Sequence, residues 1–203
     1  MFGPNSRLIR FLTAVCDLMI LNVLFLISCI TVVLAGDGAV SLYTVTLRMF
    51  RGTEESPGKS FLHSLKRNFL PSVPTALLLL TDMTLLAVLR GVLYAETLLL
   101  SPAVFVFLVS AAVFLTALLS YLFPLLARFD NTFPRHLGNA GRLAVAHLPV
   151  TFLLTTINLL PVLLPLFFPQ LLGVVAAFWM FLGFSTGAWV NSFYLNRIFS
   201  EKD

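Results

Sequence analysis

Charged residues are scarce in this sequence: Asp, Glu, Lys and Arg make up 11% of its 203 residues, against about 25% in soluble proteins. Hydrophobic residues make up 59%, and twenty of them are Phe. One soluble core of this size cannot hide that much apolar surface. The composition therefore excludes a soluble domain and predicts an integral membrane protein.

Cysteine and histidine are also rare, with two Cys and three His. Cys16 and Cys29 fall in one apolar run, roughly 20 Å apart on a helix, which is too far for a disulfide. None of His63, His136 and His147 stands at metal-ligand spacing with a carboxylate. No phosphate-binding glycine loop, nucleophile elbow or zinc signature occurs. We therefore predict no enzyme activity, no cofactor and no metal.

The net charge is +4, but no basic run is interleaved with aromatic residues. A binder of single-stranded nucleic acid needs such a run, so nucleic acid is excluded as a partner. The positive charge is better explained by membrane topology and by contact with anionic lipid at the inner face.

Five apolar runs reach the roughly 20 residues that a bilayer core demands. They cover about 11–35, 73–94, 101–123, 143–164 and 171–195. Only helices satisfy the backbone at that depth in a chain without the alternating pattern of a barrel. The predicted fold is all-α, a polytopic transmembrane helical bundle that forms one domain over 1–203. The first run is too long for a signal peptide and is predicted to be an uncleaved span.

The stretch 36–71 is the longest interval without such a run, and it holds five of the thirteen Lys and Arg residues. Its first part has polar residues at 3–4-residue spacing, namely Ser41, Thr44, Arg48 and Arg51. That spacing is typical of an amphipathic helix, and Pro57 is suited to begin a second one. We expect basic amphipathic elbow helices at the cytoplasmic membrane surface.

The distribution of Lys and Arg predicts the orientation. With five spans and the first loop inside, ten of these residues lie inside and three outside. The N-terminus is then outside and the C-terminus cytoplasmic. The alternative places the N-terminus inside and needs the first run to be a re-entrant hairpin or a sixth span, with a turn near Asp37.

Several segments resemble the YesL family of small bacterial integral membrane proteins. They are MFGPNSRLIRFLTAVCDLMILNVLFLISC, VTLRMFRGTEES, SFLHSLKRNF, SYLFPLLARFDNTFPRHLGNA and VNSFYLNRIF. The resemblance implies a location in the bacterial plasma membrane and a role accessory to carbohydrate uptake. It also implies a component of a carbohydrate ABC importer as a possible partner. The family offers no catalytic residues, and the sequence departs from its usual pattern at Asp37.

Intramembrane polar residues are the strongest functional signal, because charge inside a bilayer is costly. Asp82 lies near the middle of the second span, Asn158 in the fourth and Asp17 in the first. We consider a solute- or proton-linked site and structural interhelical hydrogen bonds as the two interpretations.

Gly183, Gly187 and Asn191 fall on one face of the fifth span. A small residue every fourth position lets two backbones approach closely. This face is predicted to pack within the chain or, alternatively, to form a homodimer.

The cytoplasmic side carries acids as well as bases, which a lipid anchor alone does not require. We predict an internal latch or a docking surface formed by Arg48, Arg51, Glu54, Glu55, Arg128, Asp130 and Asn131. The leading hypothesis is thus a non-enzymatic accessory protein of carbohydrate utilisation. The alternative is a small dimeric transporter with a polar site around Asp82 and Asn158.

Overall fold

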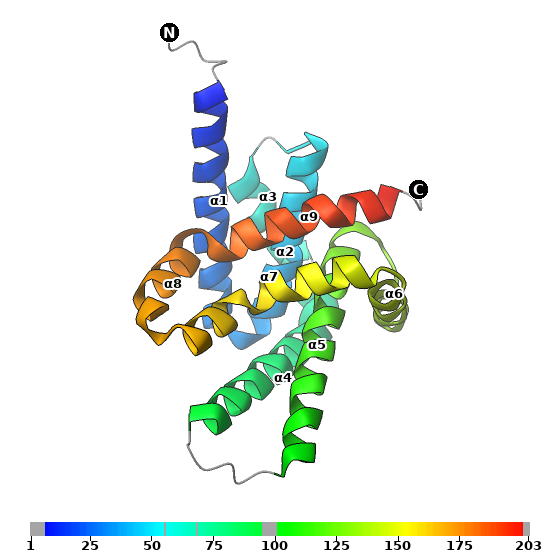
Figure 1. The fold of residues 1–203 in the computed structure, drawn as a ribbon. Coiled ribbons are helices and arrows are strands. Elements are labelled where there is room, and N and C mark those ends of the chain that lie inside the picture. Colours follow the sequence, from blue (N-terminus) through cyan, green and yellow to red (C-terminus); the bar gives the residue numbers. More distant parts are fainter. Residues whose placement is uncertain (1–6, 55, 68, 95–100, 201–203) are drawn as a thin grey trace.

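The computed structural model describes residues 7–54, 56–67, 69–94 and 101–200, and each regular element in these ranges is helical (Figure 1). The elements are α1 (Arg7–Ile30), α2 (Val32–Arg51), α3 (Pro57–Arg67), α4 (Phe69–Tyr94), α5 (Pro102–Arg128), α6 (Phe133–Ala146), α7 (Leu148–Phe167), the 3-10 turn η1 (Pro169–Leu171), α8 (Leu172–Phe178), the π-helical turn η2 (Trp179–Gly183) and α9 (Phe184–Ser200).

Five helical stretches are long and apolar enough to cross a membrane, which confirms the predicted count. They are Phe11–Ile30, Val73–Leu93, Pro102–Arg128, Leu148–Phe167 and Pro169–Phe199. The all-α transmembrane fold class is therefore confirmed.

The first span ends earlier than predicted, at Ile30 instead of residue 35. Thr31 is extended (φ −98°, ψ 113°), and its carbonyl accepts a hydrogen bond from the Leu34 amide at 2.9 Å. This one-residue break reverses the chain, so α2 runs back along α1 in the opposite direction (Figure 1). The alternative of a hairpin had placed the turn near Asp37, but Asp37 lies inside α2.

The position of α2 differs from the surface elbow expected for this part of 36–71. Every residue from Gly36 to Leu47 is buried, and α2 packs against α1, α3, α4, α5 and α9. The Thr44 and Thr46 hydroxyls bond within the protein, whereas Ser41 Oγ is buried and has no hydrogen-bond partner among the described residues. Thr44 donates to the carbonyl of Val40 at 2.9 Å, and Thr46 donates to that of Leu42 at 3.0 Å.

The second elbow helix, α3, begins at Pro57 as expected and is amphipathic. Phe61 and Ser64 are buried, whereas Lys66 and Arg67 are exposed. Phe61 is fully buried and belongs to the main core, so α3 is anchored to the bundle by its apolar side.

The fourth span begins at Leu148, later than the predicted residue 143. Leu143 belongs to α6, and His147 separates the two helices. Pro149 explains the boundary, because a proline is tolerated in the first turn of a helix but disrupts its interior.

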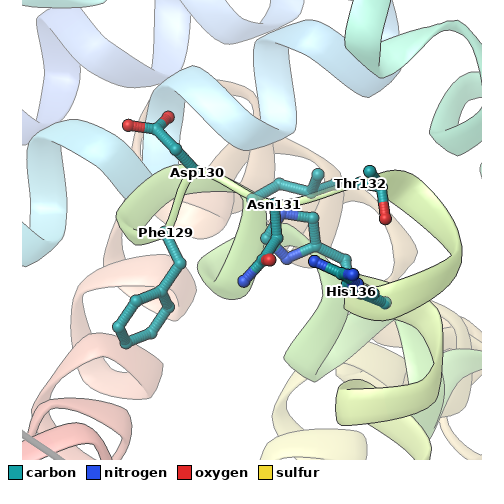
Figure 2. A pocket seen from close by; sticks show the side chains of 7 residues that line it. Phe129, Asp130, Asn131, Thr132 and His136 are labelled. Carbon is teal, nitrogen blue, oxygen red and sulfur yellow. The ribbon is translucent and has the colours of Figure 1, made fainter.

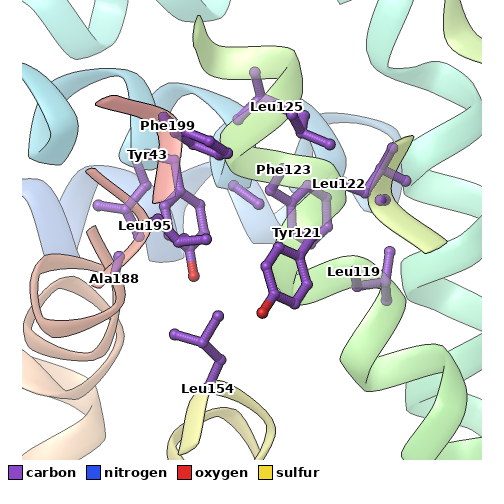
Figure 3. Close-up of a cluster of buried hydrophobic side chains, with 14 of the residues drawn as sticks. Tyr43, Leu119, Tyr121, Leu122, Phe123, Leu125, Leu154, Ala188, Leu195 and Phe199 are labelled. Carbon is purple, nitrogen blue, oxygen red and sulfur yellow. The ribbon is translucent and has the colours of Figure 1, made fainter. Parts of the chain in front are cut away.

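The hydrophobic core lies between α2, α5 and α9 (Figure 3), with contributions from α1, α3, α6 and α7. Tyr121, Leu122, Leu154 and Leu195 are among its fully buried side chains. The same core therefore holds together helices that lie far apart in the sequence.

Candidate functional site

Asp82 lies at the middle of the Val73–Leu93 span and is only 2% exposed. Thr75 and Leu89, one heptad to either side, are also buried, so this face of α4 points into the protein. The Thr116 hydroxyl of α5 donates to the Asp82 carboxylate, with Oγ1 at 3.2 Å from Oδ1 and 3.0 Å from Oδ2. The Asp82 carboxylate is therefore hydrogen-bonded to a hydroxyl inside the protein and does not face lipid.

The hydrogen bonds continue from Thr116 along α5 to α7. Ser120, one turn further on, donates from Oγ to the Thr116 carbonyl at 2.7 Å. Asn158 of α7 donates from Nδ2 to Ser120 Oγ, also at 2.7 Å. The two predicted intramembrane residues, Asp82 and Asn158, are therefore linked through two hydroxyl residues.

From Asn158 the connection reaches α9 and α2. Asn191 Nδ2 donates to Asn158 Oδ1 at 3.0 Å and to the Tyr43 hydroxyl at 3.0 Å. We call this set the buried polar chain: Tyr43, Asp82, Thr116, Ser120, Asn158 and Asn191. It joins α2, α4, α5, α7 and α9.

A second contact lies beside this chain on α7. The Tyr121 hydroxyl and Thr151 Oγ1 share a hydrogen bond of 2.9 Å. In Figure 3 the hydroxyls of Tyr43 and Tyr121 both point toward Leu154 of α7. Two tyrosine hydroxyls therefore lie near this segment of α7.

Two buried polar atoms here have no hydrogen-bond partner among the residues that the structure describes. They are Thr155 Oγ1, one turn from both Thr151 and Asn158, and Asn191 Oδ1. Asn191 is fully buried and Thr155 is 6% exposed. A buried polar atom without a partner is costly, so the polar chain retains hydrogen-bonding capacity for a further small polar species.

Asp17, the third predicted intramembrane residue, is not brought into this set. It is half-buried on α1, and α1 contributes no member to the buried polar chain. The polar residue that α1 inserts into the protein is instead Asn22, which is fully buried.

Asn22 holds the π-helical turn η2. Its Nδ2 donates to the carbonyls of Trp179 at 3.0 Å and Met180 at 2.8 Å, and its Oδ1 accepts from the Ser185 amide at 3.0 Å. A π-helical turn disturbs the regular backbone bonding of a helix, and Asn22 satisfies the groups concerned. No role for Asn22 was predicted from the sequence.

The glycines of α9 contact their own chain. A Cβ on Gly183 would lie 2.5 Å from Cγ of Trp179, and one on Gly187 would lie 3.6 Å from Cγ2 of Ile157 on α7. Gly183 therefore makes room for the Trp179 ring, and Gly187 packs against α7. Of the two alternatives, packing within the chain is the one that these contacts support.

Gly36 and Gly38 of α2 place Asp37 at a crossing of three helices. A Cβ on Gly36 would lie 2.6 Å from the backbone nitrogen of Ala76 on α4, and one on Gly38 would collide with Ser28 of α1. The absence of side chains thus permits two close helix contacts, and Asp37 between them is fully buried.

The predicted latch residues lie at several places. Glu54 accepts at Oε1 from the Ser56 amide at 3.1 Å and from Ser60 Oγ at 2.7 Å, which secures the start of α3. Arg51 Nε donates to the Leu47 carbonyl at 3.4 Å, and the Arg48 carbonyl accepts from Thr53 Oγ1 at 3.3 Å. These contacts are local to the loop between α2 and α3.

The remaining predicted latch residues lie at the end of α5, where Arg128 Nη1 donates to Asn196 Oδ1 of α9 at 3.3 Å. Its guanidinium lies 5.4 Å from the ring centroids of both Phe129 and Phe199. Asp130 and Asn131 follow in an exposed loop. Glu55 lies outside the described residues, and a pairing between the two halves stays a prediction.

Sequence reasoning missed Tyr43, Thr116 and Ser120. A signal existed for the last two, since they are hydroxyl residues at i and i+4 on one face of an apolar span. Tyrosine is common at membrane interfaces, so the sequence alone does not indicate that Tyr43 is buried.

Residues 18–89 match a family described as a protein of unknown function, DUF624, which is the YesL-like family of membrane proteins. The match covers most of α1, all of α2 and α3, and α4 as far as Leu89, and so includes Tyr43 and Asp82 but not Asn158 or Asn191. Searches of curated proteins and of solved structures gave no match. The chain is thus similar to a family of membrane proteins without an assigned activity, over less than half of its length.

Proposed function

We propose that this protein is a non-enzymatic, multi-pass membrane protein that moves a small polar solute or a proton, with Asp82 as the charged residue on the path. The observation that carries the proposal is the buried polar chain, which connects Asp82 at mid-span to Tyr43 through four further residues, with the Thr116 backbone carbonyl as the acceptor for Ser120. A carboxylate at such depth costs at least about 2.5 kcal/mol and usually marks a functional site.

The two partnerless atoms beside the chain support transport over a purely structural network. A network that only joins helices is expected to use all its donors and acceptors. Asn191 Oδ1 and Thr155 Oγ1 instead offer an acceptor and a hydroxyl around Asn158. A passing solute or water molecule would bond to them.

Flux through proteoliposomes tests the proposal. Vesicles holding the purified chain and the pH dye pyranine report proton flux under a potassium diffusion potential, and a labelled monosaccharide added outside reports solute uptake. Wild type should pass at least one probe, and Asp82→Asn should abolish that flux. Asp17→Asn, an acid-to-amide change on α1 outside the polar chain, should retain it. Wild-type vesicles without flux of either probe would contradict the proposal.

A second candidate is an accessory role in carbohydrate utilisation, with a carbohydrate ABC importer component as the partner. It is supported by the family resemblance and by exposed polar groups on the loops that follow α2 and α5. In this case Arg51→Ala with Asp130→Ala should abolish growth on a transported sugar while the protein still inserts. Normal growth of that double variant would count against it.

We propose the bacterial plasma membrane as the location, with both termini cytoplasmic. The prediction of an outside N-terminus assumed that 11–35 is one crossing, whereas α1 and α2 form an antiparallel hairpin. With α2 as a buried sixth crossing, the basic residues of the N-terminal segment, the 52–56 loop and α3, the α5–α6 region and the C-terminal segment all fall on one side. That arrangement satisfies the positive-inside rule better than the original one.

A further inference from the structure

An open pocket of about 470 Å³ lies where α5 ends and the loop leads into α6 (Figure 2). Leu126 and Phe129 form its apolar part. Its polar lining consists of Asp130, Asn131, Thr132, Arg135 and His136. None of these residues belongs to the buried polar chain, so the pocket is a separate candidate binding site.

The start of α6 gives the pocket a positive character. The first-turn amides of a helix have no acceptor within the helix and carry the positive end of its dipole. Thr132 occupies the N-cap position, but its hydroxyl makes no capping bond. The amides concerned are those of Phe133 and Arg135, because Pro134 has no N–H, and the exposed Arg135 side chain adds a positive charge to the lining. Anions bind readily in such a place.

His136 supplies an independent sign of a missing ligand. It is only 1% exposed, and its Nδ1 has no hydrogen-bond partner in the part of the chain that the structure describes. Burial lowers the pKa of His136, while a hydrogen bond to the backbone of Asn131 and the charge of Asp130 oppose that effect. A neutral ring that donates through Nε2 presents a lone pair at Nδ1.

The close-up shows how these groups lie. His136 and Asn131 stand together at the centre of the lining (Figure 2), and the Asp130 carboxylate points away from them. Asp130 and Arg135 are both exposed, so water and salt screen both charges. Because the Asp130 carboxylate points away, the polar centre of the pocket is formed by Asn131, Thr132, Arg135 and His136.

The donor set selects among anions. The helix start and Arg135 require negative charge, whereas Nδ1 of a neutral His136 requires a hydrogen. A phosphate monoester has both, because its second pKa is about 6 and one proton is shared readily near neutral pH. Sulfate carries similar charge and shape but holds no proton at that pH.

We propose that this pocket binds a phosphate monoester, with Arg135 and the first turn of α6 holding the charge and His136 Nδ1 sharing the proton. The group comes either from a small soluble phosphate or from the headgroup of phosphatidic acid, and both offer the same chemistry. The site does not depend on the proposed transport function.

The test follows the ring nitrogens of His136 by NMR in the full chain, labelled with ¹⁵N-histidine and held in an uncharged, phosphate-free detergent. His136→Gln assigns the resonances among the three histidines. Inorganic phosphate, sulfate and short-chain phosphatidic acid are titrated separately at pH 7. The variants are Arg135→Gln and, as the matched control on the exposed side of α6, Arg142→Gln.

The shift of the His136 resonances should give a Kd for phosphate at least about tenfold lower than that for sulfate. Arg135→Gln should raise the Kd for phosphate by about tenfold. Arg142→Gln should bind as wild type does. A shift with inorganic phosphate would show that a soluble phosphate is sufficient for binding. A shift with phosphatidic acid alone would identify the lipid headgroup as the ligand. If neither probe moves His136, or if sulfate binds as well as phosphate, the proposal is overturned.

Discussion

Asn191 of α9 donates a 3.0 Å hydrogen bond from Nδ2 to Oδ1 of Asn158 on α7. Each asparagine also bonds to a further helix, Asn191 to Tyr43 of α2 and Asn158 to Ser120 of α5. The amide pair therefore connects the α2–α9 side of the protein to the α5–α7 side, and through Thr116 to Asp82. A substitution at either asparagine should therefore disturb the packing of both groups of helices.

Replacing one asparagine by leucine leaves the other with an unsatisfied amide. Asn158→Leu and Asn191→Leu should each lower the free energy of unfolding in bicelles by about 1–3 kcal/mol. The double variant should lose about 1 kcal/mol less than the sum, because both amides are then gone. Strict additivity would show that the pair is not coupled. Asn139→Leu on α6 combined with Asn158→Leu serves as the uncoupled control.

Asn22 should matter for stability well beyond its size. Asn22→Ala removes three hydrogen bonds to the backbone around η2, and about 2–3 kcal/mol of unfolding free energy should be lost. Asn139→Ala, a half-buried asparagine on α6, should cost less than about 1 kcal/mol. Equal effects of the two changes would mean that η2 does not depend on Asn22. Denaturant titration followed by tryptophan fluorescence measures both.

The two glycines of α9 should respond differently to a methyl group. Gly183→Ala forces the Trp179 ring to move and should destabilise the protein by about 1–3 kcal/mol. Gly187→Ala meets Ile157 at an ordinary contact distance and should be neutral to within about 1 kcal/mol. Trp179→Leu should reduce the cost of Gly183→Ala. If that second change gives no relief, the ring is not the cause.

Labelling of single cysteines tests the orientation. In a variant without Cys16 and Cys29, Thr53→Cys should react with a membrane-impermeant maleimide only after cells are permeabilised, and Gln170→Cys should react in intact cells. An epitope at the N-terminus should be protected like Thr53→Cys. An N-terminal epitope that is accessible in intact cells would restore the outside orientation predicted from the charge count.

Acid should destabilise the region around His136. Burial holds the pKa of His136 below its ordinary value of 6.5, so the unfolded chain takes up the proton at a higher pH than the folded chain. Stability should therefore fall as the pH drops from about 7 to 5. The charged groups near the ring are Asp130, whose charge opposes the lowering of the pKa of His136, and Arg135, which lines the same pocket.

Melting midpoints at pH 7.5, 6.5 and 5.5 measure this dependence in phosphate-free buffer. His136→Gln should flatten it, whereas His63→Gln, at an exposed position on α3, should not. A profile that His136→Gln leaves unchanged would assign the acid sensitivity to other groups.

Hydropathy and composition alone predict the membrane class, the helical fold and five apolar stretches long enough to cross a bilayer, because bilayer thickness and backbone hydrogen bonding leave few other solutions. The start of α3 at Pro57 follows from local chemistry in the same way. Asp82 and Asn158 are recognisable as unusual because polar side chains at that depth are rare.

The long-range pairing does not follow from these local signals. The period of Ser41 and Thr44 indicates an amphipathic helix, yet α2 is buried, and the Thr44 hydroxyl bonds inside the protein to the Val40 carbonyl and to Ser64. Nothing local pairs Asn22 with η2 or Asn191 with Asn158, which are separated by 157–158 and 33 residues. Such bonds arise only when packing brings distant helices together, so tertiary contacts alone place Asp82 at the end of a chain that reaches Tyr43.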